Sequence, residues 1–527
     1  MLTDEQTHDV GEGRNLKRPS QNAFIVVTVG LLAFGVYLWQ LSVPEFVGFY
    51  DSGVYLAATI HFVSGALPYK DFVFVNPPGL LILLSPVGIL ARIFGSHDGL
   101  VIARIATSFV TAGNVSLLAW LVRHRGRVAM LVAGVGLALL PVVLIVSSGV
   151  RLEPYCILLV LLAALIICSE DLARGEHSKR SLIIAGLLFG LAASIKLWAF
   201  FPFVAALICL TPQYRKRVLP FVGGAAAGFI VPVIPFFLLA PRNFLSQVFG
   251  AQFLAKPNLT ETTGVLWRLG DLMGFQSSSL APSGRETVVI WLILICLIVV
   301  AYWQRLELEM ADRFLLVSFI ITGAGILVAP ASSAYYYYFS APFLVGLIAV
   351  TLARLGRRCH ALANRIRVSD DVRRPLNWLA GVASLILVFA LTLYSTTFFT
   401  NFAWGDGLYS PWLSKVATDV PSGSCVVSDF VVYELATNRF AGNSPDCPDI
   451  VDPYGVWQVW NNDYADPPAP LVALWKSYFE SANYVVLNSP STVFVPWNKG
   501  LKAWFATHYR MVSDSHGVFI YLRVTGS

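Results

Sequence analysis

Long apolar runs separated by short polar connections dominate the chain. Most of these runs approach the length of about 20 residues that a helix needs to cross the hydrocarbon of a bilayer. We predict eleven spanning helices, at residues 23–41, 99–122, 128–148, 154–170, 181–195, 197–211, 219–240, 287–304, 314–331, 340–353 and 376–397. The pattern therefore predicts an α-helical polytopic membrane protein with about 11 transmembrane helices.

Composition supports this class. Of the 527 residues, 56% are hydrophobic and 13% are charged, whereas a soluble domain carries about 25% charged residues. The mean hydropathy is +0.67. The net charge of +6 arises in the connections between spans, because the tail is acidic. The positive charge is therefore a topology signal, and we predict membrane lipids but no nucleic acid among the partners.

Basic residues in short connections mark the cytoplasmic side of a membrane protein. They cluster at residues 123–127, 174–180, 215–217, 305–313 and 354–374. With an odd number of spans, this places residues 1–22 in the cytoplasm and everything after Phe398 outside. No small-residue cleavage site follows the first span, so we expect a retained helix and not a signal peptide. We expect an integral protein of the bacterial inner (plasma) membrane.

One apolar run, Pro78 to Phe94, does not fit this alternation. If it crossed the membrane, the basic residues at 123–127 would lie outside and every later connection would be inverted. We therefore expect this run and the stretch from Ser52 to Ala66 to form interfacial helices in a structured first outer loop, residues 43–98. The turn at Pro77-Pro78-Gly79 would join them.

The tail, residues 399–527, has seven Lys or Arg against eleven acids. Apolar runs at 425–427, 484–487 and 518–524 predict strands, and 410–419, 471–479 and 501–508 predict helices. This pattern indicates a small extracytoplasmic α/β domain. Cys425 and Cys447 are the two cysteines expected outside, where an oxidising compartment favours a disulfide between them. No cysteine spacing predicts a zinc site, and no metal ligand set is legible.

Candidate functional residues gather at the predicted outer surface, where ionisable groups are costly unless they are paired or used. A tyrosine run at 335–338 reads either as an aromatic belt or as a platform on which Tyr335 or Tyr337 stacks a sugar or an acceptor. The other candidates are Asp51, Tyr55, Lys70, Asp71 and Asn76 in the first outer loop, Arg104 at the second span, Arg151 and Glu153 after the third, and Lys196 after the fifth.

The order of these motifs resembles the GT-C class of integral-membrane glycosyltransferases. The resemblance covers roughly residues 20–400 and is greatest to lipid A aminoarabinose transferases and protein O-mannosyltransferase-like enzymes. Those relatives commonly carry a second acid where this chain has Ser52, and Glu-Lys where it has Val75-Asn76. The motifs are Asp51 in a long outer loop, Pro77-Pro78, Arg104 in Val101-Ile102-Ala103-Arg104, Glu153-Pro154, and Lys196 in Ser194-Ile195-Lys196.

The resemblance implies an enzyme that moves a sugar from a polyprenyl-phosphate donor to a glycan, lipid or protein acceptor outside the membrane, with inversion. Asp51 would be the general base. Glu153 would orient the acceptor or a cation, while Lys196, Arg151 and Arg104 would stabilise the departing phosphate. It also implies a glycosyltransferase module at residues 23–398, followed by the outer domain at 399–527. No cofactor is implied, although the acidic outer loops allow a divalent cation.

Other interpretations of the same residues stay open. Asp51 precedes a predicted helix and would cap it well. Arg151 and Glu153 would make a structural ion pair, and Lys196 would snorkel to the interface. At the level of the whole protein, the alternatives are a transporter or lipid flippase and a non-catalytic scaffold. Transporters place ionisable groups near the bilayer midplane and repeat their halves, and neither feature is visible in the sequence.

Overall fold

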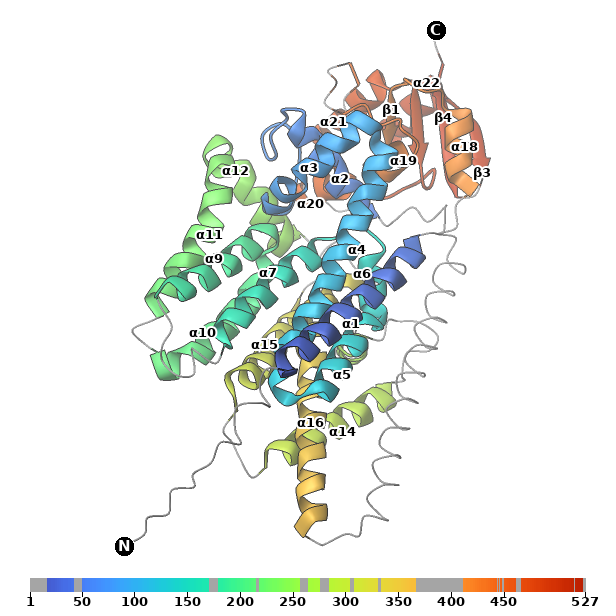
Figure 1. The fold of residues 1–527 in the computed structure, drawn as a ribbon. Helices are drawn as coiled ribbons and strands as arrows, with labels where there is room; N and C mark the ends of the chain where they lie inside the picture. The colour runs from blue at the N-terminus through green and yellow to red at the C-terminus, as the bar shows by residue number, and fades with distance from the viewer. Residues whose placement is uncertain are drawn as a thin grey trace, which may run out of the picture.

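The computed structural model describes residues 17–41, 50–169, 179–214, 218–255, 264–274, 284–303, 308–329, 333–365, 411–442, 444, 446–447, 450–460, 466–515 and 517–524. It consists of a helical bundle with a smaller domain, formed by the C-terminal residues, at one end (Figure 1). The span predicted at 376–397 lies outside the described residues.

The bundle is almost entirely helical. In chain order its elements are α1 (Lys17–Leu41), α2 (Tyr50–Val63), α3 (Gly79–Phe94), α4 (Ser96–Leu121), η1 (Arg123–Arg125), α5 (Arg127–Ala138), α6 (Pro141–Ser147), α7 (Leu152–Ile167), α9 (Lys179–Ile195), η2 (Leu197–Ala199), α10 (Phe200–Tyr214), α11 (Val218–Leu239), α12 (Pro241–Phe244), the π-helix η4 (Leu245–Ala255), α13 (Val265–Leu272), α14 (Gly284–Tyr302), α15 (Met310–Val328), η6 (Ala334–Phe339) and α16 (Ala341–Arg365).

Several of these helices are long and apolar enough to span a bilayer. Within the described residues there are five: α1, α4, α11, α14 and α15. A sixth forms if α5 and α6 are one span bent by 59°. The bend falls where Pro141 begins α6, because proline has no N–H to continue the hydrogen bonding of α5. The prediction of a polytopic helical membrane protein is confirmed, while the number eleven stays a prediction.

Helices α9 and α11 pack unusually closely through glycines. Gly186 and Gly190 of α9 lie against the backbone of Phe221 and Ala225, and Gly224 of α11 lies against the backbone of α9 in return. Small residues four positions apart let two helix backbones approach, which is the usual way in which helices associate in a membrane. The close packing of α9 and α11 fixes the position of the end of α9, which the turn at Lys196 follows.

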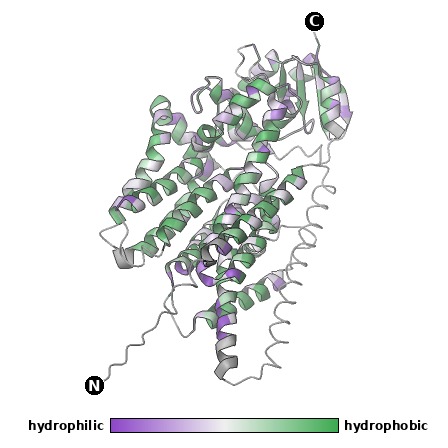
Figure 2. Ribbon diagram, in the orientation of Figure 1, coloured by the Kyte–Doolittle hydropathy of each residue, from purple (hydrophilic) through white to green (hydrophobic). Residues whose placement is uncertain are grey.

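Helices α2 and α3 lie at the end of the bundle that carries the C-terminal domain (Figure 1). The lower half of α16 and the start of α5 lie at the opposite end. Apolar residues cover most of the bundle, and α16 changes from apolar to polar along its length (Figure 2). The described part of the chain thus has a two-ended arrangement, with α2 and α3 beside the domain. Their depth in the bilayer stays a prediction.

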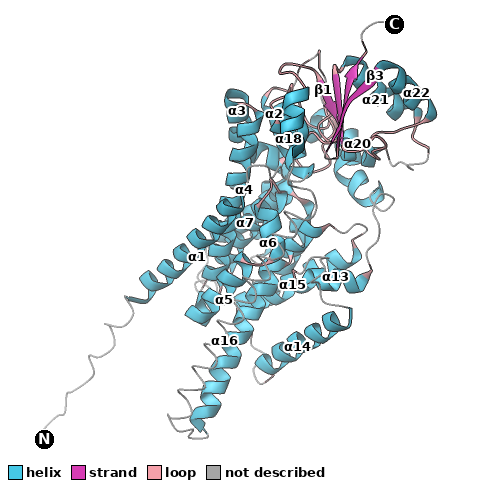
Figure 3. Cartoon of the chain, turned by 90° about the vertical axis from the view of Figure 1, so that its right-hand side faces the viewer, coloured by secondary structure: helices cyan, strands magenta, loops and turns pink. Residues whose placement is uncertain are grey.

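The C-terminal domain contains a four-stranded mixed sheet in the order β1-β2-β4-β3 (Figure 3). Strands β1 and β2 are parallel, and the other two pairs are antiparallel. The sequence pattern predicted three of the strands but missed β3, whose polar residues interrupt the alternation. The elements are α18 (Pro411–Asp419), β1 (Val426–Ser428), α19 (Val432–Ala436), α20 (Pro453–Val459), α21 (Ala469–Ser481), β2 (Tyr484–Leu487), α22 (Lys499–His508), β3 (Tyr509–Ser515) and β4 (Val518–Arg523).

A disulfide closes one loop of this domain. Cys425 and Cys447 are bonded at an S–S distance of 2.07 Å, and their Cα atoms are 5.4 Å apart. The loop they enclose contains β1 and α19, and α19 packs against α2. The crosslink therefore ties together the part of the domain that faces the bundle.

Candidate active site

The first turn of α2 carries an ion pair that joins it to the start of α7. The Asp51 carboxylate accepts a hydrogen bond from the Arg151 guanidinium. Arg151 is the extended residue that precedes α7, and only 2% of it is exposed. Burial lowers the pKa of Arg151, but Asp51, Tyr335 and Glu153 together outweigh this effect, and the net shift is upward. The Arg151 guanidinium therefore keeps its charge despite its burial.

A second ion pair lies beside the first. Glu153, in the first turn of α7, accepts a hydrogen bond of 2.6 Å from Lys196 Nζ. Glu153 is 1% exposed, and Lys196 lies in the turn between α9 and η2. Burying a lone charge costs several kcal/mol, and mutual pairing offsets much of that cost. Two acids and two cations from separate parts of the chain therefore meet in one cluster, of which Asp51 is the most exposed member.

Aromatic rings cover the two cations. The Arg151 guanidinium carbon lies 4.3 Å from the centre of the Tyr335 ring, and Lys196 Nζ lies 4.5 Å from the centre of the Tyr336 ring. Tyr55, one turn after Asp51 in α2, is also buried, and its pKa is raised by that burial and then by the Asp51 charge. The phenol therefore stays protonated. Cation–π contacts of this kind stabilise partly desolvated cations.

The turn before Arg151 is held by hydrogen bonds from two other helices. The Ser52 hydroxyl accepts a bond of 2.9 Å from Val150 N, and Arg104 Nε donates a bond of 2.8 Å to the Ser148 carbonyl. Ser52, which replaces the second acid of the resembled enzymes, thus fixes α2 to this turn. Arg104 contacts the backbone of the same turn, which gives it a supporting place in the site.

The Pro77-Pro78-Gly79 turn packs directly against the turn that carries Lys196. A Cβ atom added at Gly79 would come within 2.7 Å of the Ser194 carbonyl oxygen, so a larger residue would force the two segments apart. Just before this turn, the Asn76 carbonyl accepts a bond of 2.6 Å from the Tyr69 hydroxyl. The double proline and glycine of the sequence motif therefore position the segment that contains Lys196.

Side-chain amides from η4 clamp the loop that leads to this turn. Gln247 Oε1 accepts a bond of 2.9 Å from Phe74 N, and Gln252 Nε2 donates a bond of 3.0 Å to the Val75 carbonyl. The wider π-helical turn places these two residues, five apart, toward the same loop. Asn243 adds a third amide bond, of 2.9 Å, to the Tyr69 carbonyl.

Other predicted site residues lie elsewhere. Lys70 and Asp71 are exposed in the turn after α2, where Asp71 Oδ2 accepts a bond of 2.8 Å from Leu67 N. The length of α2 separates this turn from Asp51 by roughly 20 Å. Tyr337 is 1% exposed and hydrogen-bonds to Asp271, in the last turn of α13. Of the two tyrosines singled out in the sequence, Tyr335 is the one that covers the ion pairs.

The C-terminal domain contributes residues that the sequence pattern missed. Tyr50, next to Asp51, donates a hydrogen bond of 2.8 Å to Asp452 Oδ1 and packs against Phe430 at 5.1 Å between ring centres. Gly53 makes this approach possible, because a Cβ atom there would lie 2.7 Å from Val432 N. Asp452-Pro453 was recognisable as a helix start, but nothing local in the sequence indicates that it meets α2.

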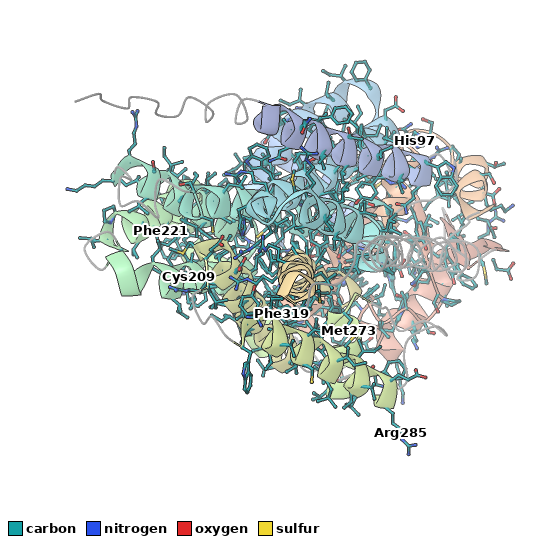
Figure 4. The ribbon with its side chains drawn as sticks, turned by 60° about the horizontal axis from the view of Figure 1, so that its bottom comes forward. His97, Cys209, Phe221, Met273, Arg285 and Phe319 are labelled. Atoms are coloured by element: carbon teal, nitrogen blue, oxygen red, sulfur yellow. A yellow bond between two sulfur atoms is a disulfide. The ribbon has the colours of Figure 1, made fainter. Side chains whose placement is uncertain are left out.

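An apolar cavity of about 420 Å³ lies between α13, α14 and α15. In Figure 4, Phe319 and Met273 are labelled on this side of the bundle, and Arg285 of α14 points away from it. The lining includes Leu272, Trp291, Phe319 and Leu327.

No group of three or more His, Cys, Asp or Glu side chains in the described ranges is placed to hold a metal ion.

Comparisons with known proteins identify a family and a fold that the chain resembles. The model of glycosyltransferase family 87 matches residues 74–330, a region that includes Arg151, Glu153 and Lys196 but begins after Asp51. Among solved structures, ArnT from Cupriavidus metallidurans bound to undecaprenyl phosphate has a TM-score of 0.60 at 15% identity, covering 96% of this chain and 99% of that one. No curated protein matches the chain in the corresponding sequence comparison.

A second structural relative is the archaeal oligosaccharyltransferase AglB from Archaeoglobus fulgidus, in complex with an inhibitory peptide and a dolichol-phosphate. Its TM-score is 0.52 at 16% identity, covering 97% of this chain and 75% of that one. The fold is thus that of the GT-C membrane glycosyltransferases. The match to glycosyltransferase family 87 covers slightly less than half of the chain and is a similarity to that family over residues 74–330.

Proposed function

We propose that the chain transfers a sugar from a polyprenyl-phosphate donor to an acceptor at the extracytoplasmic face of the membrane, with Asp51 as general base. The observation that carries this proposal is the meeting of Asp51, Arg151, Glu153 and Lys196 at the end of the bundle next to the C-terminal domain. Such a set of two acids and two cations, with Asp51 partly exposed and the other three buried, suits a reaction in which a proton is taken up and a phosphate departs.

The cations suit a lipid phosphate. Arg151 and Lys196 are each paired with an acid in the structure, so an arriving phosphate anion competes with those acids for the same donors. When Arg151 turns toward the phosphate, the Asp51 carboxylate loses its hydrogen-bonded partner and becomes a better proton acceptor. Donor binding and activation of the base are thereby coupled through Arg151.

The reaction then proceeds as one displacement. The acceptor oxygen or nitrogen attacks the anomeric carbon, and its proton passes to the Asp51 carboxylate. The bond from that carbon to the phosphate oxygen breaks, and the electron pair stays on the polyprenyl phosphate. Lys196 and Arg151 stabilise the charge that grows there. Attack opposite the leaving group inverts the anomeric centre, and Glu153 keeps Lys196 oriented until the phosphate arrives.

The two-ended fold supports the orientation. The basic residues of η1 and of the lower half of α16 lie at the end away from the C-terminal domain, as cytoplasmic positive charge does. The disulfide lies in the domain at the other end, as expected of an oxidising compartment. The apolar cavity between α13, α14 and α15 would receive part of the lipid tail. We propose that this membrane is the bacterial inner membrane.

Asp51→Asn tests the proposal. Asparagine still caps a helix but does not accept a proton at neutral pH, so turnover should fall by roughly two to four orders of magnitude. Mass spectrometry of the purified variant should still detect copurified polyprenyl phosphate. Transfer is measured as the release of polyprenyl phosphate from a radiolabelled polyprenyl-phosphate sugar in the presence of cell-envelope extract.

Asp98→Asn is the matched control. Asp98 is the acid in the first turn of α4, as Asp51 is in the first turn of α2, but it is exposed to solvent. This variant should transfer sugar at the wild-type rate. A wild-type rate for Asp51→Asn would reduce Asp51 to a helix cap. Purified wild-type protein that neither retains nor releases polyprenyl phosphate would overturn the choice of donor.

A further inference from the structure

Tyr50 forms a hydrogen-bonded connection between the catalytic end of α2 and the C-terminal domain, 402 residues away in sequence. Its hydroxyl donates to Asp452 Oδ1 at 2.8 Å and accepts from Tyr454 N at 2.7 Å. The hydroxyl is therefore fixed as both donor and acceptor by one short segment of the domain.

The ring of Tyr50 is held by the same domain. It packs edge-on against Phe430 at 5.1 Å between ring centres and is tilted against Phe494 at 5.4 Å. Phe494 in turn contacts Tyr454 at 5.7 Å. Aromatic pairs at these separations add to the area that they bury. Both ends of the Tyr50 side chain thus contact residues of the C-terminal domain.

Asp452 is well suited to hold a partner still. It is 5% exposed and precedes α20, where Oδ1 also accepts a hydrogen bond of 2.8 Å from Gly455 N. Pro453 follows at the first helical position and fixes the local backbone. The oxygen that receives the Tyr50 proton is therefore anchored by a helix cap.

We propose that Asp452 is a positioning residue for Asp51, acting through Tyr50, so that docking of the C-terminal domain sets the geometry of the base. This inference rests on the proposed function. Tyr50 and Asp51 are consecutive residues in the first turn of α2, and the Asp51 carboxylate is held on its other side by Arg151. Displacement of a reacting group by about 1 Å costs up to a hundredfold in rate, so the anchor acts on turnover.

Tyr50→Phe removes the hydroxyl and leaves the ring contacts and the α20 cap in place. We expect kcat to fall by roughly tenfold to a hundredfold, with little change in the KM for a polyprenyl-phosphate sugar. Asp452→Ala should show the same loss. Asp452→Asn should restore most of kcat, because the amide oxygen still accepts from Tyr50 and still caps α20. The double variant Tyr50→Phe/Asp452→Ala should be no slower than Asp452→Ala.

Asn498→Ala is the control for domain stability. Asn498 caps α22 of the same domain by accepting a hydrogen bond of 2.7 Å from Leu501 N. Its loss should lower the thermal unfolding temperature of the full-length protein as Asp452→Ala does, yet leave kcat unchanged. A fall in kcat for Asn498→Ala that matches the loss in Asp452→Ala would overturn the inference, as would multiplicative losses in the double variant.

The two proposals fail separately. If Tyr50→Phe turns over at the wild-type rate while Asp51→Asn in the same assay is inactive, the positioning role is wrong and the proposed function stands. If Asp51→Asn is fully active, the base assignment fails and the positioning role fails with it.

Discussion

Arg151 and Glu153 stand two residues apart at the start of α7, yet each belongs to a different ion pair, Arg151 with Asp51 and Glu153 with Lys196. Residues two apart on a helix do not face each other, so the two side chains reach different neighbours. The cluster holds two negative and two positive charges and is balanced before any substrate enters. A phosphate anion adds a negative charge, which the transfer of a proton to Asp51 would offset.

The Glu153–Lys196 pair makes opposite predictions for its two members. Lys196→Ala removes a cation from the phosphate site and should lower retention of polyprenyl phosphate. A hydrogen bond to a charged group contributes about 1.5–3 kcal/mol, which corresponds to roughly tenfold or more in affinity. Glu153→Gln leaves Lys196 without its acid, so retention should be equal or higher. The measurement is the molar ratio of copurified polyprenyl phosphate to protein by mass spectrometry.

Folding defects can be separated from this effect. Lys196→Ala leaves the Glu153 carboxylate buried without its cation, which is destabilising in itself. The double variant Lys196→Ala/Glu153→Gln removes that charge and should recover thermal stability without recovering the lipid. Equal lipid content in wild type, Lys196→Ala and the double variant would show that Lys196 serves structure alone.

The disulfide predicts a specific labelling pattern. Cys425 and Cys447 should resist alkylation in the folded protein until a reductant is added, whereas Cys359, which is exposed, should label at once. Mass spectrometry of the labelled peptides separates the three sites. A crosslink of this loop length contributes on the order of 3 kcal/mol, so reduction should also lower the unfolding temperature. Full labelling of Cys425 and Cys447 without reductant is the contrary result.

Sequence patterns located the helices well but not the pairing of their side chains. The runs Ser52 to Ala66 and Pro78 to Phe94 correspond closely to α2 and α3, since apolar periodicity and a Pro-Pro turn are local signals. The charge pairing of Arg151 with Glu153, considered from the sequence as an alternative, is replaced by bonds to Asp51 and Lys196. Partners 100 and 43 residues away depend on how helices pack.

The contact between the C-terminal domain and the site could not be predicted from the sequence either, because it also depends on how distant segments pack together. Asp452 and Tyr50 are separated by 402 residues, and each has an adequate local explanation, one as a helix cap and the other as an interfacial aromatic. Ser52 is a further case: its identity looked like the loss of an acid, whereas its hydroxyl holds the turn at Val150. Such roles appear only when the two segments are seen together.

Asp429 predicts how the C-terminal domain responds to pH. It follows β1, is completely buried, and accepts a hydrogen bond of 3.0 Å from Asn488 N. Burial raises the pKa of its carboxyl from 3.8 to about 7. The folded state therefore keeps a proton that the unfolded state releases across this window. Stability from this group is present at low pH and is lost as the pH rises toward 7, by up to about 1.4 kcal/mol per pH unit.

Asp429→Asn removes the titration and keeps both a donor and an acceptor at that position. Thermal unfolding of the full-length protein at pH 5, 6, 7 and 8 should therefore show a shallower decline for this variant than for wild type. Asp419→Asn is the control, because Asp419 makes a surface pair of 2.9 Å with Lys415 and should leave the slope unchanged. Identical slopes for wild type and Asp429→Asn would mean that the pKa of the Asp429 carboxyl is the same in the folded and the unfolded state. Phe430, the next residue, packs against Tyr50, so the same variant should also reduce the pH dependence of turnover above pH 7 if ionisation of Asp429 loosens that contact.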